Sequence, residues 1–252
     1  MGSIDWQQTG ALATVTLSNP ARMNAMTRAM WLQLREAFLD IATRNDLRCV
    51  LVQGAGGNFS AGGDISEYPA FRFDLNSLMQ FHEVEVWGAL QAMLDCPLPL
   101  LALVRGNCMG AGLEISSCCD VRLGAAGSVY GAPIARLGFP MAPREAALVH
   151  QAVGAATASA MLLAAESFDA AHMLRCGFLA WTVPDEAVQA QADALVARML
   201  ALSPQAARLN KQVLRQGPSA QEPTPASAYA YADSHEHSEG VQAFLEKRRP
   251  DF

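Results

Sequence analysis

The segment of residues 98–120, LPLLALVRGNCMGAGLEISSCCD, constrains the fold more than any other part of the chain. It begins with a short, unbroken apolar run, Leu98–Val104, which Pro99 and Gly106 bound. A run of this length without polar alternation is typical of a strand that is buried on both faces of a parallel sheet. Because the side chains of such a strand are buried, functional groups are expected at its ends, in the residues that follow it.

A turn of small residues follows this strand and leads into a helix. Gly110, Ala111 and Gly112 leave the backbone nearly bare, so unpaired N–H groups at the helix start can approach a ligand closely. Such donors, with the helix dipole behind them, suit an anionic oxygen, although tight strand-to-helix packing would explain the same residues. Glu114 then stands in the first turn of an otherwise apolar helix, as a surface acid that matches the dipole or as a buried acid or base.

Strands and helices alternate over the first half of the chain. Apolar runs predict the strands, and apolar residues at helical spacing predict the helices between them. The predicted strands are residues 11–17, 49–53, 98–104 and 121–125, and the predicted helices are residues 27–43, with Thr27 as N-cap, and 78–94. Residues 65–78 and 130–138 are predicted to be irregular. This order favours βαβ units and an α/β fold with a largely parallel sheet.

The last third of the chain is predicted to be helical. The predicted helices are residues 144–153, 155–165, 170–175, 185–202 and 204–214, and residues 216–225, rich in proline and polar residues, form a connection. We therefore expect a core that is followed by a helical appendage.

A second glycine-rich loop, residues 54–64, follows the predicted strand 49–53. In a P-loop a Lys-Ser/Thr pair follows the glycines, and this loop has no such pair after it. Its glycines also do not have the GxGxxG spacing of a dinucleotide site. The simpler interpretation is that the backbone approaches a ligand closely, with Ala61 and Gly62 offering N–H groups.

The composition limits the partners of the chain. Of its 252 residues, 51% are hydrophobic and 17% are charged. A surface with so few charged residues suggests that part of it is buried between subunits, although a large monomer is also compatible with this composition. The net charge of −6 argues against nucleic acid or an anionic membrane as the main ligand.

The six cysteines lie in apolar segments without the CxxC spacing of a zinc or redox site, so we expect buried thiols and no metal. The sequence shows neither a basic leader before an apolar core nor an apolar run long enough to span a bilayer. A cytoplasmic protein without a membrane partner is therefore expected.

Several separate motifs resemble those of one family. They are Asn19-Pro20 with Asn24-Ala25, Phe59-Ser60-Ala61-Gly62-Gly63-Asp64, residues 106–120, Gly138 with Ala152-Val153-Gly154, and the segment 239–248. Together they resemble, over essentially the full length, the crotonase or enoyl-CoA hydratase/isomerase superfamily. The resemblance implies an α/β fold with a ββα-spiral core that binds acyl-CoA, residues 1–195, and a C-terminal helical trimerisation region, residues 196–252. It also implies homotrimers or hexamers.

The same resemblance implies a coenzyme A thioester as substrate, without a prosthetic group, in chemistry of the kind used in fatty acid metabolism. In the family two backbone N–H groups hold the thioester oxygen and stabilise an enolate, and by motif these fall on Ala61 and Ala111. Glu114 falls on a catalytic glutamate. The resemblance places coenzyme A against residues of the early loops and the basic end of a neighbour's last helix, namely Arg22, Ala25, Ala61, Gly62, Gly63, Asp64, Ile65, Lys247 and Arg248.

One catalytic position of the family departs from its pattern. Hydratases of the family use a second glutamate directly after the position of Pro133, and this chain has Ile134 there. Because isoleucine cannot transfer a proton, the sequence favours a single-carboxylate shuttle, in which Glu114 is first base and then acid in double-bond isomerisation or related isomerase or lyase chemistry.

Three alternatives stay open. A hydratase with a displaced second acid is one, with Glu145 as first candidate and Glu67, His82, Glu83 and Glu85 as weaker ones. A non-catalytic acyl-CoA-binding protein is another. A serine peptidase on the related spiral fold, with Ser60 as nucleophile, is remote because no partner histidine and acid are evident.

Overall fold

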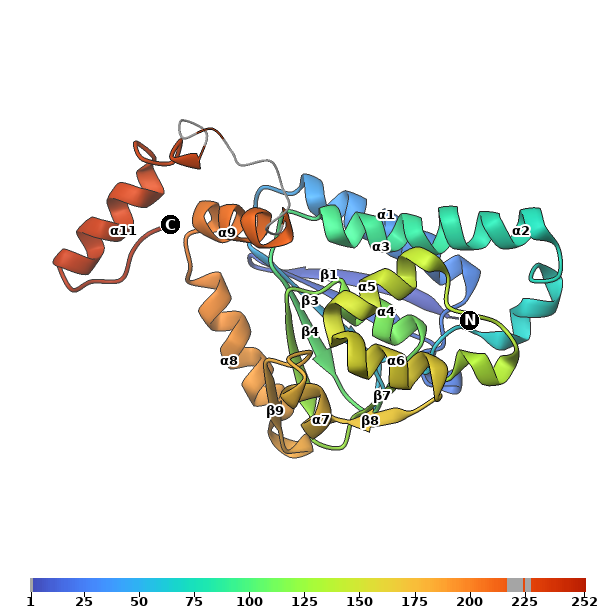
Figure 1. The fold of residues 1–252 in the computed structure, drawn as a ribbon. Coiled ribbons are helices and arrows are strands. Elements are labelled where there is room, and N and C mark those ends of the chain that lie inside the picture. The colour runs from blue at the N-terminus through green and yellow to red at the C-terminus, as the bar shows by residue number, and fades with distance from the viewer. Residues whose placement is uncertain (1, 217–223, 225–227) are drawn as a thin grey trace.

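A mostly parallel sheet runs through the protein (Figure 1). The computed structural model describes residues 2–216, 224 and 228–252, and in this part six strands form the sheet in the order β1-β2-β3-β4-β6-β9. They are β1 (Ser3–Thr9), β2 (Leu12–Ser18), β3 (Cys49–Gly54), β4 (Leu100–Val104), β6 (Val121–Ala125) and β9 (Trp181–Val183). Only the β1–β2 pair among them is antiparallel, which confirms the prediction of a largely parallel sheet.

Strand β4 lies inside the sheet, between β3 and β6, and all five of its residues are buried. Its side chains alternate between two cores. Leu100, Ala102 and Val104 belong to the larger core, together with residues of α1 (Arg28–Thr43) and α3 (Trp87–Asp95). Leu101 and Leu103 pack in a smaller core against α8 (Val188–Leu200) on the other face. The unbroken apolar run is thus explained by burial on both faces.

Helix α1 forms where its sequence predicts it. Thr27 caps the helix, since its side chain accepts a hydrogen bond from the backbone N–H of Met30, 3.2 Å away. Met30, Leu34, Phe38 and Ile41, which recur at helical spacing, are fully buried.

Several short elements differ from the prediction. Residues 65–78 contain a 3-10 turn, Ile65–Ala70, and most of helix α2 (Leu75–Met79), and the predicted loop 130–138 contains β7 (Val129–Gly131) and a 3-10 turn, Ile134–Leu137. The last third is not purely helical, because β8 (Ser167–Asp169) and β9 interrupt it. Strands of three residues are too short for a period-two pattern to show in the sequence.

The helix from α2 to α3 is continuous but irregular. Between these elements residues Gln80–Val86 form a π-helical segment. Wide turns of this kind occur mostly as short insertions in α-helices, and frequently at functional sites.

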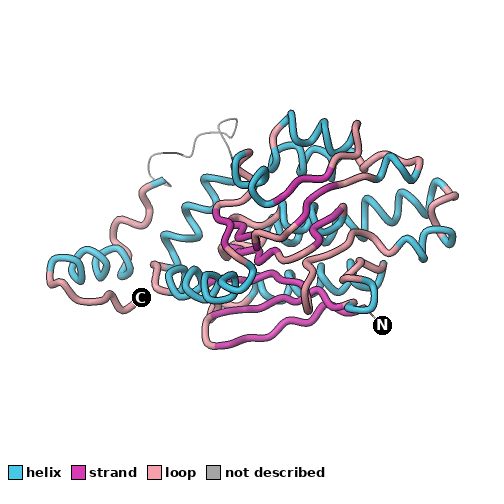
Figure 2. Tube along the Cα trace, turned by 90° about the horizontal axis from the view of Figure 1, so that it is seen from below, coloured by secondary structure: helices cyan, strands magenta, loops and turns pink. Residues whose placement is uncertain are grey.

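The C-terminal helices are α5 (Pro143–Val153), α6 (Ala155–Leu163), α7 (Ala170–Arg175), α8, α9 (Pro204–Gln216) and α11 (His235–Leu245). Helices α9 and α11 lie at one end of the protein, and α11 projects away from the sheet (Figures 1 and 2). Leu214, Phe244 and Leu245 are more than 70% exposed. The trimerisation role of residues 196–252 remains a prediction, and most of the predicted connection 216–225 lies outside the described residues.

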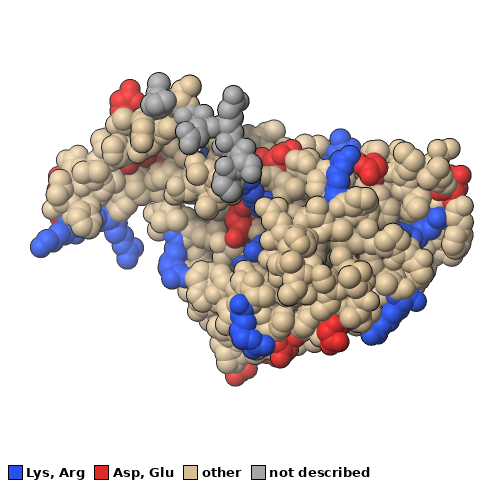
Figure 3. All heavy atoms as spheres, viewed as in Figure 1, with Lys and Arg blue, Asp and Glu red and all other residues tan. Residues whose placement is uncertain are grey.

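Charged side chains are scattered over the face shown in Figure 3, and most of that face carries no charge. The six cysteine thiols, all in the described part, are free, and five of them are buried. In the residues that the structure describes, no group of three His, Cys, Asp or Glu side chains is placed to hold a metal ion. No helix there has the length and apolar character needed to cross a membrane.

Gly106 joins β4 to β5 (Asn107–Met109) with a φ of +52°, and a Cβ there would lie 2.3 Å from the Gly57 carbonyl oxygen. Gly106→Ala is therefore expected to lower the free energy of unfolding by about 2–3 kcal/mol, through left-handed strain and the clash. Gly10 has a φ of +57° but open space at its Cβ position, so Gly10→Ala is expected to cost only the strain, about 1 kcal/mol. Urea unfolding of both variants measures this, and equal losses would contradict the clash.

Candidate active site

Two glycine loops meet beside the carboxyl end of the sheet. The loop after β3 pairs with β5 through a parallel bridge between Ser60 and Cys108. Gly62 and Gly110, with φ of +111° and +46°, face each other so closely that a Cβ on Gly110 would lie 3.7 Å from the Gly62 Cα. The positive φ values, more than the available space, favour glycine at both positions.

The backbone hydrogen bonds decide which N–H groups of these loops are free. Ala111 opens α4 (Ala111–Ser117), so its N–H has no partner within the helix. In the first loop the bridge between Met26 and Gly63 uses the Gly62 carbonyl and the Asp64 N–H. Among the described residues, the N–H groups of Gly63 and Ala111 have no hydrogen-bond acceptor, and both residues line one pocket.

The predicted donor at Ala61 does not agree with this pattern. Its N–H donates to the Met23 carbonyl oxygen at 2.9 Å, and the N–H of Gly62 donates to the Ser60 hydroxyl at 3.2 Å. Both donors are therefore already engaged within the protein, whereas the N–H group of Gly63 is free.

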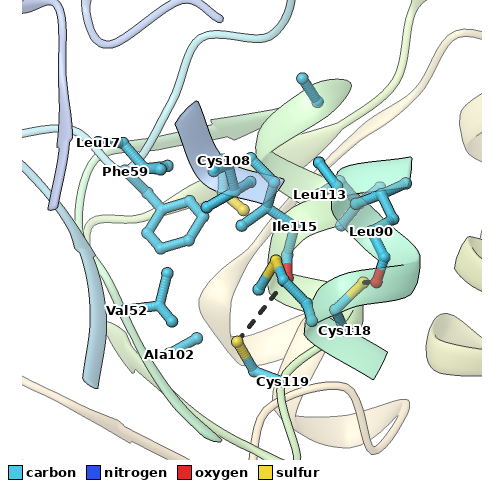
Figure 4. Packing of buried hydrophobic residues seen from close by; sticks show 14 of the residues in the cluster. Leu17, Val52, Phe59, Leu90, Ala102, Cys108, Leu113, Ile115, Cys118 and Cys119 are labelled. Carbon is cyan, nitrogen blue, oxygen red and sulfur yellow. Dashed lines mark hydrogen bonds between the residues drawn. The ribbon is translucent and has the colours of Figure 1, made fainter. Parts of the chain in front are cut away.

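Glu114 lies on helix α4, which is buried in the core. All seven of its residues are buried, and Figure 4 shows Leu113 and Ile115 among the packed apolar side chains, with Cys118 and Cys119 just beyond the helix. Burial, and then the charge of Glu145, raise the pKa of the Glu114 carboxyl well above its ordinary value. Glu114 is thus a buried carboxyl group that favours its protonated form.

Glu145 reaches the same pocket from the first turn of α5, which packs on α4. Its side chain is 2% exposed, and its Oε1 atom lies 3.1 Å from Nδ1 of His82, a residue of the π-helical segment. On the other side of the imidazole, Nε2 lies 3.3 Å from Nη1 of Arg72.

The guanidinium of Arg72 decides the tautomer of His82. Because a guanidinium has only donors, His82 Nε2 must accept the hydrogen bond from Arg72. The ring proton then resides on Nδ1 and is donated to Glu145 Oε1. In this tautomer, His82 donates to Glu145 and fixes the position of its carboxyl group.

The pocket between these elements has a volume of about 340 Å³. The polar side chains that line it beside the glycine loops include Glu114, Glu145, His82, Arg72, Tyr68 and Arg136. Ile134 lines it too, so the position at which the sequence lacks a second carboxylate does face the pocket. The structure thus brings Glu114 and Glu145 together, each from its own helix.

The residues predicted to bind coenzyme A have different positions. Ala61, Gly62, Gly63 and Ile65 line the pocket. Arg22, Ala25 and Asp64 do not line it, and Arg22 Nη1 is paired with Asp64 Oδ1 at 2.6 Å. Lys247 and Arg248 follow α11, away from α4 and α5 (Figure 1), and Arg248 pairs with Glu239 and Glu246.

Of the weaker catalytic candidates, His82 lies in the pocket, and the three glutamates are engaged elsewhere. Glu67 accepts from the backbone N–H of Arg28, Glu85 pairs with the Arg28 side chain, and Glu83 pairs with Arg144. The Ser60 hydroxyl is fully buried and donates to the Asn24 carbonyl oxygen at 2.8 Å. This bond argues against a nucleophilic serine.

Sequence reasoning missed Arg72 and Tyr68, which also line the pocket. Both lie in a stretch that was predicted to be irregular. An Arg and a Tyr within ten residues of the first glycine loop were the only signal available, and such residues are common on surfaces.

Comparison with known proteins gives consistent matches. A family model described as enoyl-CoA hydratase/isomerase matches residues 7–252. The 2,3-dehydroadipyl-CoA hydratase of Escherichia coli is 30% identical over 246 residues, which cover 94% of this chain and 93% of the relative. A probable enoyl-CoA hydratase of Rhodobacter capsulatus is 32% identical and covers 99% of this chain and 97% of the relative. The crystal structure of an enoyl-CoA hydratase/carnithine racemase from Magnetospirillum magneticum has a TM-score of 0.95 at 34% identity, covering 99% of this chain and 94% of that one.

Proposed function

The chain belongs to the enoyl-CoA hydratase/isomerase family and has the crotonase fold, and we propose that it hydrates a 2-enoyl coenzyme A thioester with Glu114 and Glu145 as its acid and base. The observation that carries the proposal is the entry of both carboxyl groups into one pocket from neighbouring helices. A shuttle by Glu114 alone, which the sequence favours, would leave the buried Glu145 without a role.

The two free N–H groups are suited to hold the thioester oxygen. Gly63 and Ala111 present them from the two facing loops. Water adds to the β-carbon of a conjugated thioester as negative charge develops on this oxygen, and fixed backbone donors stabilise that charge without reorganisation. We therefore assign the donor pair to Gly63 and Ala111.

The hydrogen bond of Glu145 and the raised pKa of Glu114 support different roles for the two carboxyl groups. Glu145, which accepts from the neutral His82, takes a proton from water as the water oxygen bonds to the β-carbon. Glu114, whose pKa is raised, gives its proton to the α-carbon of the enolate. Glu145 is then protonated and Glu114 ionised, and proton exchange with the next water molecule resets the pair.

Coenzyme A binding and assembly complete the proposal. Arg22 lies half exposed next to the first glycine loop, where it can meet a phosphate. Lys247 and Arg248 lie away from the pocket of their own chain, so they would serve the site of a neighbouring subunit. The exposed apolar side chains of α9 and α11 support subunit contacts of this C-terminal region in a homotrimer or hexamer.

Glu145→Gln tests the role of the second carboxyl group. Hydration of crotonyl-CoA is expected to fall about 100-fold in kcat, because the amide cannot accept the proton of water. Isomerisation of a 3-enoyl thioester, which needs one base, is expected to change little if the protein catalyses it. The loss of the conjugated thioester absorbance measures the first reaction, and its gain measures the second.

Glu83→Gln is the matched control, since Glu83 is 42% exposed, pairs with Arg144 and lies outside the pocket lining. Full hydration by Glu145→Gln would overturn the two-carboxylate mechanism in favour of Glu114 alone. A wild-type protein that binds butyryl-CoA but catalyses neither reaction would identify a non-catalytic acyl-CoA-binding protein.

A further inference from the structure

We infer that the Tyr68 hydroxyl is a third hydrogen-bond donor to the thioester oxygen, seated in the space that the missing side chain of Gly63 leaves open. The inference rests on the proposed function, in which Gly63 and Ala111 are the first two donors. It assigns a substrate contact to a residue outside both glycine loops.

The first observation is the fit between Tyr68 and Gly63. A Cβ built on Gly63 would lie 2.2 Å from the Tyr68 hydroxyl oxygen and 3.2 Å from its Cζ. The hydroxyl therefore lies so close to Gly63 that a side-chain methyl group at this residue would clash with it, and it lies next to the backbone whose N–H is free. Glycine is the one residue that allows this approach.

The second observation is that the Tyr68 ring is held from several sides. The ring makes edge contacts with Phe71 and Phe139 at centroid distances of 5.8 and 5.9 Å, and the Arg72 guanidinium lies 4.6 Å from its centroid. Its 3-10 turn is capped by Asp64, whose side chain accepts from the Ser66 N–H. The hydroxyl is consequently presented by a ring with little freedom to move.

The third observation is that the hydroxyl is a donor without an acceptor. Within the described part of the chain, no atom makes a hydrogen bond with the Tyr68 hydroxyl, although the residue lines the pocket. Burial raises the pKa of this phenol, Arg72 opposes the rise, and Glu114, Asp64 and Glu145 add to it. The phenol therefore keeps its proton and can donate it in a hydrogen bond.

The thioester oxygen is the acceptor that these positions favour. The carboxyl groups of Glu114 and Glu145 are assigned to proton transfer, and the enolate charge develops on the oxygen that Gly63 and Ala111 hold. The hydrogen bond from a third donor beside Gly63 becomes stronger in the transition state, because the thioester oxygen gains negative charge there. This hydrogen bond should therefore raise kcat more than it lowers KM.

Tyr68→Phe tests the inference, because it removes the hydroxyl and keeps the ring. We expect kcat/KM for crotonyl-CoA hydration to fall about 10- to 100-fold, mostly in kcat. Butyryl-CoA labelled with ¹³C at the carbonyl provides a second readout, since loss of a hydrogen bond moves its infrared carbonyl band toward the frequency of free butyryl-CoA. Tyr130→Phe is the matched control: the Tyr130 hydroxyl also packs on a glycine, Gly124, but lies in the buried core.

A second arm uses Gly63→Ala, whose methyl group would displace the hydroxyl. Gly63→Ala is expected to reduce kcat/KM for hydration by about the same factor as Tyr68→Phe. Because both changes remove the same hydrogen bond, the double variant should be less than two-fold slower than either single variant. Losses that multiply would contradict a shared origin. Unchanged kinetics and an unchanged carbonyl band in Tyr68→Phe would overturn the inference.

Glu114→Gln separates this inference from the proposed function. That variant should lose hydration and keep the carbonyl band of bound butyryl-CoA, because it alters proton transfer and leaves the three donors in place. A wild-type protein without hydratase activity would refute the proposed function, while a band that shifts in Tyr68→Phe would still support the Tyr68 contact.

Discussion

Glu114→Gln is expected to lower kcat for crotonyl-CoA hydration by about 10³- to 10⁴-fold, the largest effect of any single substitution that we predict. Glutamine has nearly the same shape as protonated glutamic acid, but it cannot give a proton to the α-carbon. Since Glu114 is buried in α4 and favours its neutral form, the exchange should leave the packing of the helix intact.

Two measurements separate chemistry from folding in this variant. The urea midpoint should stay at or above that of the wild type, since a buried acid is replaced by a neutral amide. Exchange of the α-proton of butyryl-CoA in deuterated water should fall together with hydration. Wild-type rates of both hydration and exchange in a folded Glu114→Gln protein would exclude Glu114 from proton transfer.

The raised pKa of Glu114 also predicts a pH dependence. An acid must be protonated to act, so the alkaline limb of kcat/KM should follow Glu114, with activity falling as the pH rises through the raised pKa of this carboxyl group. Because the charge of Glu145 contributes to this rise, Glu145→Gln should move the alkaline limb of its residual activity to lower pH. A limb that stays in place would show that the two carboxyl groups are not coupled.

The sequence alone predicted the parts of the site that depend on local pattern. An unbroken apolar run predicts β4, and a Thr before a helical repeat predicts the start of α1. The glycines at 110 and 112, with Glu114 two residues on, predict a bare helix start with an acid in its first turn, as the structure has it. These features are encoded within about ten residues, so the rest of the fold is not needed to read them.

Features that depend on contacts between distant segments were not predictable in this way. Whether Ala61 or Gly63 offers a free N–H depends on hydrogen bonds with Met23 and Met26, in a different loop. The pairing of His82 with Glu145 spans 63 residues and requires the π-helical segment to turn the imidazole toward α5. Neither relation leaves a periodic trace in the sequence.

In the proposed mechanism, Glu145 takes the role of the second carboxyl group from a position other than that of the family motif. Ile134 and Glu145 line the same pocket, one from a 3-10 turn and the other from α5. A carboxyl group need only reach the water from some wall of the cavity, so the loss of an acid at position 134 does not by itself exclude a two-carboxylate mechanism. Glu145 is the third residue of α5, in the first turn of that helix.

Ala111→Pro is expected to lower kcat by about 10²- to 10³-fold, or about 2.7–4 kcal/mol of transition-state stabilisation, because it deletes one donor to the thioester oxygen. Proline suits this place, since Ala111 is the first residue of α4 and its N–H makes no bond within the helix. The preceding Gly110 has a φ of +46° and a ψ of −109°, outside the helical region that a following proline disfavours.

Ala111→Gly is the control, because it removes the methyl group and retains the N–H. It should keep kcat within a few-fold of the wild type, and free coenzyme A, which has no thioester oxygen, should bind all three proteins with similar affinity. In bound ¹³C-carbonyl butyryl-CoA, the infrared band should shift toward the free frequency only in the proline variant. A proline variant with wild-type kcat and an unshifted band would remove Ala111 from the oxygen site and leave Gly63 as its only backbone donor.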